Sequence, residues 1–274
     1  MHVTELSVHP VKSTRPLSRE RVDVRPEGLA EDRRWMVVDP AGAFLSARSE
    51  ARLLTVTATP LTAGGLRLEG PHADPIEVDA PHEVTPISVT VWGDRLRALP
   101  SSPAAHRWFS ALLDADVRLV WQHDPGSRAV DGAVGGPDDR VNLADSCPVL
   151  VTTTGSLRQL NDWIAEAAVT RGAPAPSPLA MRRFRPNVVV ATDEGFVEDR
   201  WRRVQIGEVG LQVAKPCGRC LVTTIDPETL ERNPEPLATL GRLRRMDDRL
   251  CFGVLMIPEA QGSLHVGDRV IADG

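Results

Sequence analysis

The sequence predicts a mixed β/α fold that is predominantly β. Short stretches of β-branched and alternating apolar residues occupy most of the first hundred positions and return beyond residue 187, with Gly- and Pro-containing turns between them. Only three segments have apolar residues at helical spacing. We therefore expect two regions, a β-barrel or sandwich over residues 1–120 and a mixed region with a few helices over residues 121–274.

Seven strand-like stretches are expected in the first region, and the turn signals DPAG, TAGG and Gly93-Asp94 lie between or within them. The stretches are TELSVHPV, RRWMVVD, FLSA, LLTVTAT, LRLEG, PIEVDA and ISVTVWGDRLRAL. Short strands at such close spacing are typical of a barrel or a sandwich and not of a doubly wound parallel sheet.

A helix is expected directly after these strands. Ser102 is a suitable N-cap, and Pro103 suits the first helical position. One face of this helix carries Ala105, Trp108, Phe109, Leu112 and Leu113. The strand VRLVWQ follows, and residues 123–146 then form a Gly-, Asp- and Pro-rich loop whose length indicates either a functional or a mobile segment.

The second region is expected to combine strands with two helices. After the strand PVLVTTT, Ser156 and Gln159 form a capping-box pair for a helix, which the Pro-rich connector RGAPAPSPLA follows. The apolar stripe of that helix is Leu157, Leu160, Ile164, Ala167 and Ala168. The remaining predicted elements are the strands NVVVAT, WRRVQIG, VGLQVAK, LVTTID, CFGVLMI and DRVIAD and a short helix in PLATLGRLRR.

Charge and composition exclude some classes of function. The formal net charge is −5 and the isoelectric point is near 5.8, which gives no overall attraction for nucleic acid, and no basic amphipathic tract indicates a membrane surface. No window approaches the ~18 apolar residues of a membrane span, and the N-terminus lacks the pattern of a secretion signal. Four cysteines are too few for a disulfide scaffold, so we expect a cytoplasmic protein. From the charge and the hydropathy we expect no nucleic-acid or membrane partner.

The stretch VAKPCGRCLVTTIDP, residues 213–227, contains Cys217 and Cys220, and four interpretations of this pair are open. Zinc sites usually combine two such pairs, whereas the other two cysteines of the chain are isolated. A redox dithiol is expected at the start of a helix, but LVTTID has the residues of a strand. The pair can also be two buried core thiols, or one thiolate can hold a soft metal whose other ligands belong to a cofactor. The adjacent Arg219 and Lys215 favour a thiolate because cations lower the pKa of a thiol.

Several basic stretches fit an anionic cofactor. Only two of the 32 basic residues are lysines, and they lie in HPVKST and KPCGRC. Lys12 and Ser13 provide a point charge and a hydroxyl suited to a phosphate, although no Gly-rich nucleotide-binding loop precedes them. Further candidates are Arg33, Arg48, Arg185 and Asn187. Each of these arginines, taken singly, is also compatible with a solvated surface position. We keep that interpretation for Arg34, Arg200, Arg202 and Arg203.

Six stretches carry a family resemblance, and they occur in the order HPVKS, GLAEDRRWMVVD, LSARS, FRPNVVV, EDRW and KPCGRCLVTTIDP. In these stretches the chain resembles the MOSC-domain proteins that have an N-terminal MOSC β-barrel region, the group of the amidoxime-reducing component and its bacterial relatives. The resemblance extends from about residue 3 to VGDRVI near the C-terminus. It implies a MOSC β-barrel core and the binding of molybdenum cofactor, a pyranopterin dithiolene with a terminal phosphate. It also implies that a single cysteine, Cys220, ligates molybdenum.

The resemblance implies further site residues. Lys12, Ser13 and Arg33 match positions that the family uses around the pterin and its phosphate. Further cofactor contacts fall at Asp145, Ser146, Arg185, Asn187, Gly218 and Arg219. The chain also departs from its relatives here. Ser146 and Cys147 stand where Thr and Ser are frequent, and Gly218 replaces a common Ser, so a side-chain donor is lost.

The implied function is that of a molybdenum-dependent oxidoreductase that reduces N-hydroxylated or N-oxygenated small molecules by oxygen-atom removal at a cysteine-ligated molybdenum. Because the chain carries no ferredoxin-like cysteine cluster at its C-terminus, the resemblance implies a separate electron-donor protein of ferredoxin, flavoprotein or cytochrome type. We expect a monomer. The alternative from a different class is a carrier that binds molybdenum cofactor or sulfur without turnover. A third interpretation is a zinc-bound or metal-free binding module.

Overall fold

The computed structural model describes residues 1–71 and 73–274 and has a predominantly β fold, which confirms the predicted fold class. The chain divides into two compact units. The first unit comprises Met1–Ser7, Ser18–Pro26 and Val149–Gly274, and the second comprises Val8–Leu17 and Glu27–Pro148. The chain therefore leaves the first unit and returns to it twice. The predicted division into residues 1–120 and 121–274 stays a prediction about sequence domains.

A nine-stranded sheet forms the centre of the first unit. Its strand order is β19-β14-β15-β17-β12-β13-β1-β2, and β16 pairs with β17. The strands are β1 (His2–Val8), β2 (Leu17–Arg19), β12 (Val149–Thr153), β13 (Val188–Ala191), β14 (Arg203–Ile206), β15 (Val209–Gly218), β16 (Arg245–Met246), β17 (Arg249–Pro258) and β19 (Val270–Asp273). Outside this sheet, β3 (Arg21–Arg25) pairs antiparallel with β18 (Gly262–His265). Neither β3 nor β18 was predicted from the sequence.

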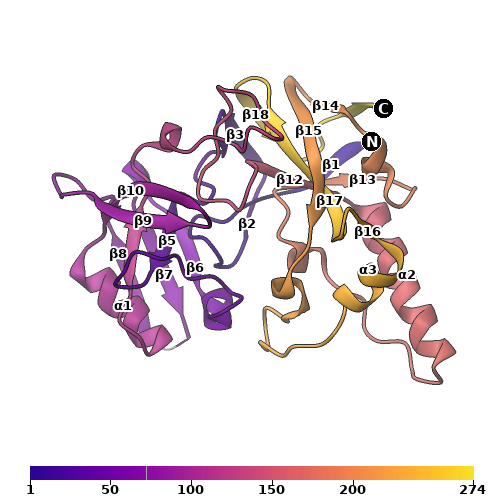
Figure 1. Cartoon of the computed structure of the whole chain (residues 1–274), viewed down its shortest axis with the longest axis horizontal. Helices are drawn as coiled ribbons and strands as arrows, with labels where there is room; N and C mark the ends of the chain where they lie inside the picture. The colour runs from indigo at the N-terminus through magenta and orange to yellow at the C-terminus, as the bar shows by residue number, and fades with distance from the viewer. Residues whose placement is uncertain (72) are drawn as a thin grey trace. The chain divides into compact units, whose positions relative to one another are not determined.

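Two helices pack against this sheet, α2 (Thr154–Thr170) and α3 (Leu237–Leu243) (Figure 1). Leu160 of α2 and Leu240 of α3 are fully buried in one apolar cluster with Phe184 and Phe252. The rings of Phe184 and Phe252 stack with their centroids 3.9 Å apart. Because Phe252 belongs to β17, this cluster ties both helices to the middle of the sheet.

The second unit combines two sheets with the helix α1 (Pro103–Leu113). A four-stranded sheet has the order β5-β11-β10-β9, and a three-stranded sheet has the order β6-β7-β8. The strands of these two sheets are β5 (Trp35–Val38), β6 (Thr57–Pro60), β7 (Leu66–Gly70), β8 (Ala73–Val78), β9 (Ile87–Val91), β10 (Asp94–Pro100) and β11 (Arg118–Trp121), and the short strand β4 (Gly28–Leu29) lies outside them. Trp35 and Val37 join one apolar cluster, and Met36 and Val38 join another, so β5 is buried on both faces.

The helix α1 confirms its sequence prediction. Ser102 Oγ accepts a hydrogen bond from the amide of Ala105 at 3.3 Å, and Pro103 is the first helical residue. The five predicted face residues are all buried. The signals were sufficient because the cap, the proline and the apolar stripe all lie within the helix itself.

The predicted cap of α2 is wrong. Thr153 caps this helix, and its Oγ1 accepts a hydrogen bond from the amide of Ser156 at 3.1 Å. Ser156 Oγ instead donates to the buried carboxylate of Glu198 at 2.7 Å. A partner 42 residues away removes Ser156 from the local capping pattern, which sequence spacing cannot reveal.

The stretch after Cys220 is not the predicted strand. Leu221–Thr224 form the 3₁₀ helix η6, in which the two threonine hydroxyls donate to the carbonyl oxygens of Cys220 and Leu221 at 2.9 and 2.7 Å. Such local side-chain bonds compete with strand pairing and override β propensity. The stretch LLTVTAT likewise divides into the 3₁₀ helix η1 (Ala51–Thr55) and β6, and FLSA contributes only an isolated bridge at Phe44.

The long loop of residues 123–146 contains one 3₁₀ turn, η3 (Pro125–Ser127). Arg128, whose side chain is 4% exposed, donates from Nε to Asp94 at 2.7 Å. Its guanidinium also donates to the carbonyl oxygens of Asn142, Ala144 and Asp145. One buried arginine therefore holds the last part of the loop in place. The other 3₁₀ helices are η2 (Thr62–Gly64), η4 (Met181–Phe184) and η5 (Val197–Arg200).

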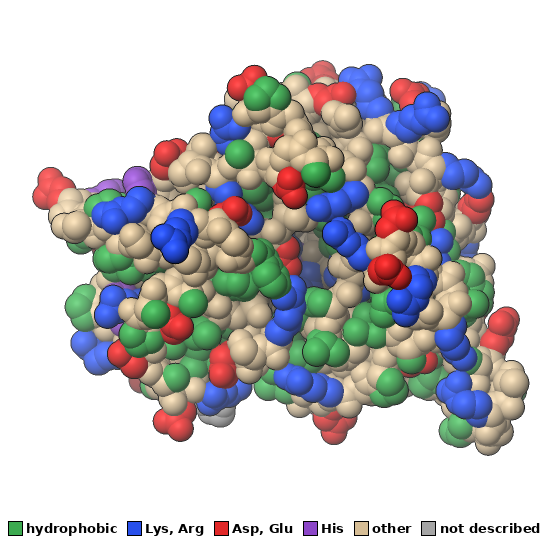
Figure 2. Space-filling model, in the orientation of Figure 1, with side chains coloured by type: hydrophobic (Ala, Val, Ile, Leu, Met, Phe, Trp, Pro, Cys, Tyr) green, Lys and Arg blue, Asp and Glu red, His purple; other side chains and the backbone are tan. Residues whose placement is uncertain are grey.

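Charged side chains of both signs are interspersed on the face that Figure 2 shows, and neither sign forms a continuous surface there. This agrees with the small net charge of −5. In the part of the chain that the structure describes, no helix combines the length and the apolar composition needed to cross a bilayer.

Candidate functional site

Three segments of the second unit meet beside the start of β5. The amide of Lys12 donates to the carbonyl of Trp35 at 2.7 Å, and the amide of Arg33 donates to the carbonyl of His9 at 2.8 Å. The amide of Leu143 donates to the carbonyl of Arg33 at 3.0 Å. These backbone bonds bring the predicted residues of HPVKS, EDRRW and the end of the long loop together.

Lys12 is buried in this meeting point, with a side chain only 6% exposed. Its Nζ donates to the carbonyl of Leu143 at 2.8 Å and to Asp145 Oδ1 at 2.5 Å. Burial lowers the pKa of Lys12, while the carboxylate of Asp145 opposes that shift. The interpretation of Lys12 as a solvated surface lysine is therefore excluded.

Asp145 links Lys12 to Arg48. Its Oδ2 lies 3.3 Å from Arg48 Nη2, and the indole N–H of Trp92 donates to Oδ1 at 3.3 Å. The guanidinium of Arg48 lies over the Trp92 ring at 4.3 Å. The surrounding protein raises the pKa of Asp145, but the two cations lower it more, so it lies well below its usual range. Since the Asp145 side chain is 57% exposed, we attribute the net shift to the cations.

Asp32 and Arg33 form a second ion pair of the same cluster. Arg33 Nη1 donates to Asp32 Oδ2 at 2.5 Å, and the His9 amide donates to Asp32 Oδ1 at 2.7 Å. Asp32 is fully buried, which by itself raises its pKa, but Arg33 and His9 hold that pKa well below the usual range. We call His9, Lys12, Asp32, Arg33, Arg48 and Asp145 the ionic cluster. Its three arginine and lysine cations exceed its two carboxylates by one charge.

Backbone strain marks several candidate residues. Ser13 has φ = 72° and Arg33 has φ = 46° in the second unit, and Arg185 has φ = 55° in the first. Trp92, in the two-residue turn between β9 and β10, has φ = 55° where Gly or Asn is usual. Non-glycine residues in this region cost about 1–3 kcal/mol each and concentrate at functional sites.

The cysteine segment, residues 217–220, lies at the end of β15 in the first unit. Cys217 is buried in the strand, and its Sγ accepts a hydrogen bond from Arg219 Nη1 at 2.9 Å. Arg219 Nη2 donates to the carbonyl of Phe184 at 2.6 Å. The guanidinium of Arg219 thus joins the cysteine segment to the FRPN segment.

Cys220 is the most accessible thiol of the four. It is half-buried, whereas Cys147, Cys217 and Cys251 are buried. Burial, and the neighbouring Cys217, raise the pKa of Cys251, which keeps that thiol protonated. The sequence predicts a strand directly after Cys220, whereas in the structure Cys217 lies within β15 and Cys220 directly precedes the 3₁₀ helix η6.

The remaining candidates of the first unit are Asn187, Arg185 and Gly218. Asn187 is 1% exposed and bonds backbone: its Oδ1 accepts from the Leu150 amide at 3.1 Å and its Nδ2 donates to the Ser7 carbonyl at 3.2 Å. Arg185 ends η4 and is half-buried. Gly218 is exposed, and a Cβ at this position would lie 3.2 Å from Arg249 Cδ, so a serine would need only a small shift of a flexible side chain.

The predicted residues therefore fall into two sets. Lys12, Ser13, Arg33, Arg48, Asp145 and Ser146 belong to the second unit, and Arg185, Asn187, Gly218, Arg219 and Cys220 belong to the first. Within the described ranges, 1–71 and 73–274, no three His, Cys, Asp or Glu side chains are grouped as a metal site.

Sequence reasoning missed three residues that position the ionic cluster: Asp32, Trp92 and Arg128. Asp32 stands next to Arg33 in EDRRW, and this adjacent pair of opposite charges was the signal for an ion pair. Trp92 precedes Gly93 at a hairpin turn, which is an unusual place for a tryptophan. Arg128 carried no such signal, because Asp94 lies 34 residues earlier in the chain and its carbonyl partners lie 14 to 17 residues further along.

Two family profiles cover most of the chain. The MOSC N-terminal beta barrel domain matches residues 1–116, and the MOSC domain matches residues 138–271. Mitochondrial amidoxime-reducing component 1 of Danio rerio is 31% identical over 284 residues, which span 98% of this chain and 83% of that protein. The chain belongs to the MOSC-domain family.

Other relatives of this MOSC-domain protein are named either as amidoxime-reducing components or as molybdenum cofactor sulfurases. Mitochondrial amidoxime reducing component 2 of Rattus norvegicus is 30% identical over 98% of this chain and 82% of its own length. A molybdenum cofactor sulfurase of Solanum lycopersicum is 26% identical over 99% of this chain but only 36% of its own length. The solved YUAD protein from Bacillus subtilis aligns over 98% of the chain with a TM-score of 0.38 and 9% identity, a likeness too low to support an inference. The cytoplasmic location predicted from the sequence stays a prediction.

Proposed function

We propose that this MOSC-domain protein binds molybdenum cofactor through Cys220 and reduces N-hydroxylated or N-oxygenated small molecules. The observation that carries the proposal is the accessibility of Cys220, the half-buried thiol among three buried ones, in the motif by which the chain resembles molybdenum-binding relatives. A soft thiolate suits molybdenum better than a hard oxygen ligand does. The amidoxime-reducing names of the relatives agree with this substrate class.

The ionic cluster fits the phosphate of such a cofactor. Lys12, Arg33 and Arg48 provide three cationic groups, and their one-charge excess over Asp32 and Asp145 attracts an anion. Ser13 and Arg33 both have positive φ, a strained backbone conformation that concentrates at functional sites, and this agrees with the proposal. In our proposal, Ser146 adds a hydroxyl beside Asp145.

In the first unit, the chain's own residues would hold and orient the dithiolene end of the cofactor. Cys220 would ligate the metal, and the exposed Gly218 would let a pterin approach the backbone without a side chain in the way. Arg219 would fix the segment through Cys217 and Phe184, and Arg185 would donate to the cofactor. Asn187 would act by holding β1, β12 and β13 together.

When bound, the cofactor supplies a two-electron couple for removal of the oxygen atom. The overall reaction cleaves the N–O bond of the substrate, consumes two electrons and two protons, and releases one water. The deoxygenated product carries an N–H where the substrate was N-hydroxylated and is the free amine where the substrate was an N-oxide. The electrons would come from a separate donor protein of ferredoxin, flavoprotein or cytochrome type. We further propose that the protein works as a monomer.

The test is to purify the protein from a host that makes the cofactor and to measure molybdenum, oxidised pterin and zinc. We expect about one molybdenum and one pterin per chain and catalytic consumption of benzamidoxime with reduced methyl viologen. Cys220→Ala should lose molybdenum and activity, because no second accessible thiol can replace the ligand among the described residues. Its matched control, Cys217→Ala, should keep substantial metal. Stoichiometric zinc without pterin, or retained molybdenum in Cys220→Ala, would refute the proposal.

A second candidate function is a carrier of molybdenum cofactor or sulfur. The observation that favours it is the likeness to molybdenum cofactor sulfurases, of which this chain matches about a third. A carrier would bind molybdenum and pterin as above but give at most one stoichiometric event with benzamidoxime. Absence of turnover in molybdenum-loaded protein, across several N-oxides and hydroxylamines, would favour the carrier.

A further inference from the structure

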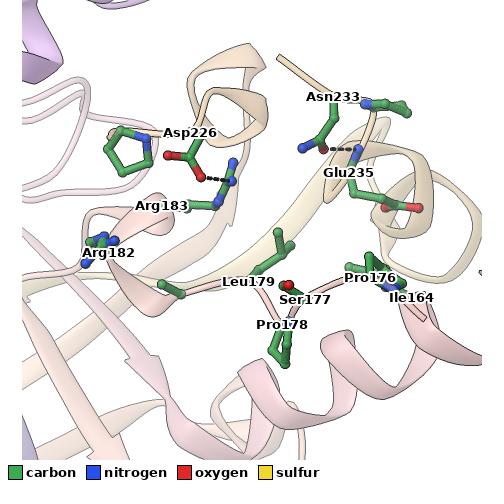
Figure 3. A pocket seen from close by; sticks show the side chains of 13 residues that line it. Ile164, Pro176, Ser177, Pro178, Leu179, Arg182, Arg183, Asp226, Asn233 and Glu235 are labelled. Atoms are coloured by element: carbon green, nitrogen blue, oxygen red, sulfur yellow. Dashed lines mark hydrogen bonds and ion pairs between the residues drawn. The ribbon is translucent and has the colours of Figure 1, made fainter. Parts of the chain in front are cut away.

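The first unit contains a pocket of about 500 Å³ that lies outside the candidate site (Figure 3). Ile164 of α2 and the Pro-rich segment 176–183 form one side, and residues 226–227 and 233–235 form the other. The Pro-rich segment is held against α2, because the side-chain amide of Asn161 exchanges two hydrogen bonds with the backbone of Leu179 at 2.8 and 3.1 Å. The wall is therefore a built part of the fold.

The acceptor groups around this pocket are already engaged. Asp226 Oδ1 accepts the amides of Glu228 and Thr229 at 2.8 and 3.1 Å, and Asp226 Oδ2 accepts Arg183 Nη2 at 2.6 Å. Both carboxylate oxygens of Glu235 bond Thr239 at 3.0 Å. The side-chain oxygen of Asn233 accepts the Glu235 amide at 3.0 Å. Each of these side-chain oxygens therefore already accepts at least one hydrogen bond from the protein.

Arg183 in contrast has a donor to offer. Its side chain is only 9% exposed, and Figure 3 shows it beside Asp226 at the pocket. Nη1 of Arg183 is buried and has no hydrogen-bond partner among the residues that the structure describes. Leaving such a group unsatisfied is unfavourable, and native structures rarely do so without a reason. Because Arg183 also lines the pocket, an oxygen acceptor from outside the chain can satisfy this donor.

The charges of the pocket select an uncharged acceptor. Arg182 and Arg183 are balanced by Asp226 and Glu235. The amide of Glu228, ahead of the amide of Thr229 and the Arg183 guanidinium, lowers the pKa of Asp226, so this carboxylate is ionised at neutral pH. A ligand carboxylate on Arg183 would lie close to that negative charge, whereas a carbonyl or amide oxygen would not be repelled.

We propose that this pocket binds an uncharged small molecule whose apolar body lies against the proline and leucine wall and whose amide-type oxygen accepts a hydrogen bond from Arg183 Nη1. The apolar wall consists of Ile164, Pro176, Pro178, Leu179 and Pro234. The volume is in the range of small-molecule sites. The inference does not depend on molybdenum or on Cys220, so it stands or falls separately from the proposed function.

The experiment titrates the full-length protein with acetanilide, benzoate and ethylbenzene and follows backbone amide shifts by NMR. We expect acetanilide to bind in the millimolar range, at least fivefold more tightly than either of the others, and to shift amides of residues 176–183. Arg183→Met should weaken acetanilide at least tenfold. The matched control Arg182→Met, which removes a side chain that is 54% exposed, should change its affinity less than twofold.

A second variant tests the charge argument in the opposite direction. Asp226→Asn removes the negative charge beside Arg183, and benzoate should then bind more tightly than acetanilide. Thermal melting of each variant shows whether it folds. If Arg183→Met does not fold, the relative affinities of Asp226→Asn for benzoate and acetanilide test the proposal. Equal binding of acetanilide and ethylbenzene in the wild type, or unchanged preference in Asp226→Asn, would mean that water satisfies Nη1 and would overturn the proposal.

Discussion

Both units bury one carboxyl group completely, but they stabilise it by opposite means. Asp32 in the second unit accepts Arg33 Nη1 at 2.5 Å and the amide of His9 at 2.7 Å. Glu198 in the first unit accepts the hydroxyls of Ser156 at 2.7 Å and Thr153 at 3.0 Å. Burial raises the pKa of both groups, and Arg33 reverses the shift for Asp32 while the hydroxyls do not for Glu198.

The contacts around Asp32 and those around Glu198 suit different roles. Cations hold the pKa of Asp32 and Asp145 low, so both carboxylates are ionised at neutral pH beside Lys12, Arg33 and Arg48. The formal excess of one positive charge in this cluster suits an anionic ligand. The hydroxyl groups around Glu198 instead tie the first turn of α2 to η5, since Thr153 is the cap of that helix and Ser156 lies in its first turn. Complete burial of a carboxyl group therefore does not by itself identify a functional site.

The largest effect is expected from removing the charge of Asp32. Asp32→Asn leaves Arg33 without its partner, and breaking a buried ion pair costs about 3–5 kcal/mol of the free energy of unfolding. Because the folded-state pKa of Asp32 is lowered, its contribution is fully present above about pH 4 and is lost as the pH falls below that value. Urea unfolding of both proteins from pH 7 to pH 2.5 should show a difference that is largest at neutral pH and shrinks in acid. A constant difference would contradict this explanation.

Local features of this fold could be predicted from the sequence, and long-range contacts could not. Residue type and resemblance made Lys12 and Arg33 candidates, and their role in a site stays a prediction. The helix α1 was predicted with its cap because its signals are local. The partners were not predictable, since Lys12 meets Asp145 across 133 residues and Ser156 meets Glu198 across 42. Spacing along the chain carries no information on such contacts.

Errors around the cysteine segment have a similar physical origin. LVTTID has the residues of a strand, but its two threonine hydroxyls bond carbonyl oxygens three residues back and turn it into η6. The predicted strand after Cys220 is therefore absent, and it is Cys217 that lies in a strand, β15. The choice of Cys220 as ligand depends on its accessibility and on the family resemblance.

The second prediction separates binding from folding in the ionic cluster. Lys12→Met fills a similar space without the charge. The free energy of unfolding of the apo protein should fall only slightly, because the Asp145 side chain is 57% exposed and can be solvated by water instead. If Lys12 holds the phosphate by a charge-assisted bond worth about 1.5–3 kcal/mol, cofactor retention should fall roughly 10- to 150-fold. Pterin content after dialysis and thermal melting measure the two effects. Arg67→Met, which breaks an exposed ion pair with Glu69 in the same unit, serves as the control and should retain its pterin.

The smallest effect is expected for Glu198→Gln, and its sign should be opposite to that of Asp32→Asn. Burial, ahead of the contacts with Ser156 and Thr153, leaves the pKa of Glu198 raised in the folded state. A carboxyl group with a raised folded-state pKa favours the fold at low pH and loses that contribution as the pH rises above its unfolded-state value of about 4.3. Glutamine resembles the protonated acid in shape and keeps hydrogen-bonding capacity toward both hydroxyls.

The stability of Glu198→Gln relative to the wild type should therefore increase between pH 4 and pH 7, by about 1 kcal/mol for each unit of pKa shift. Urea unfolding across this range measures the slope, and Glu166→Gln, on an exposed position of the same helix, controls for the loss of a carboxyl group without these contacts. A relative stability that falls with pH would mean that Glu198 is stabilised in its ionised form, as Asp32 is. The contrast between the two buried carboxyl groups would then disappear.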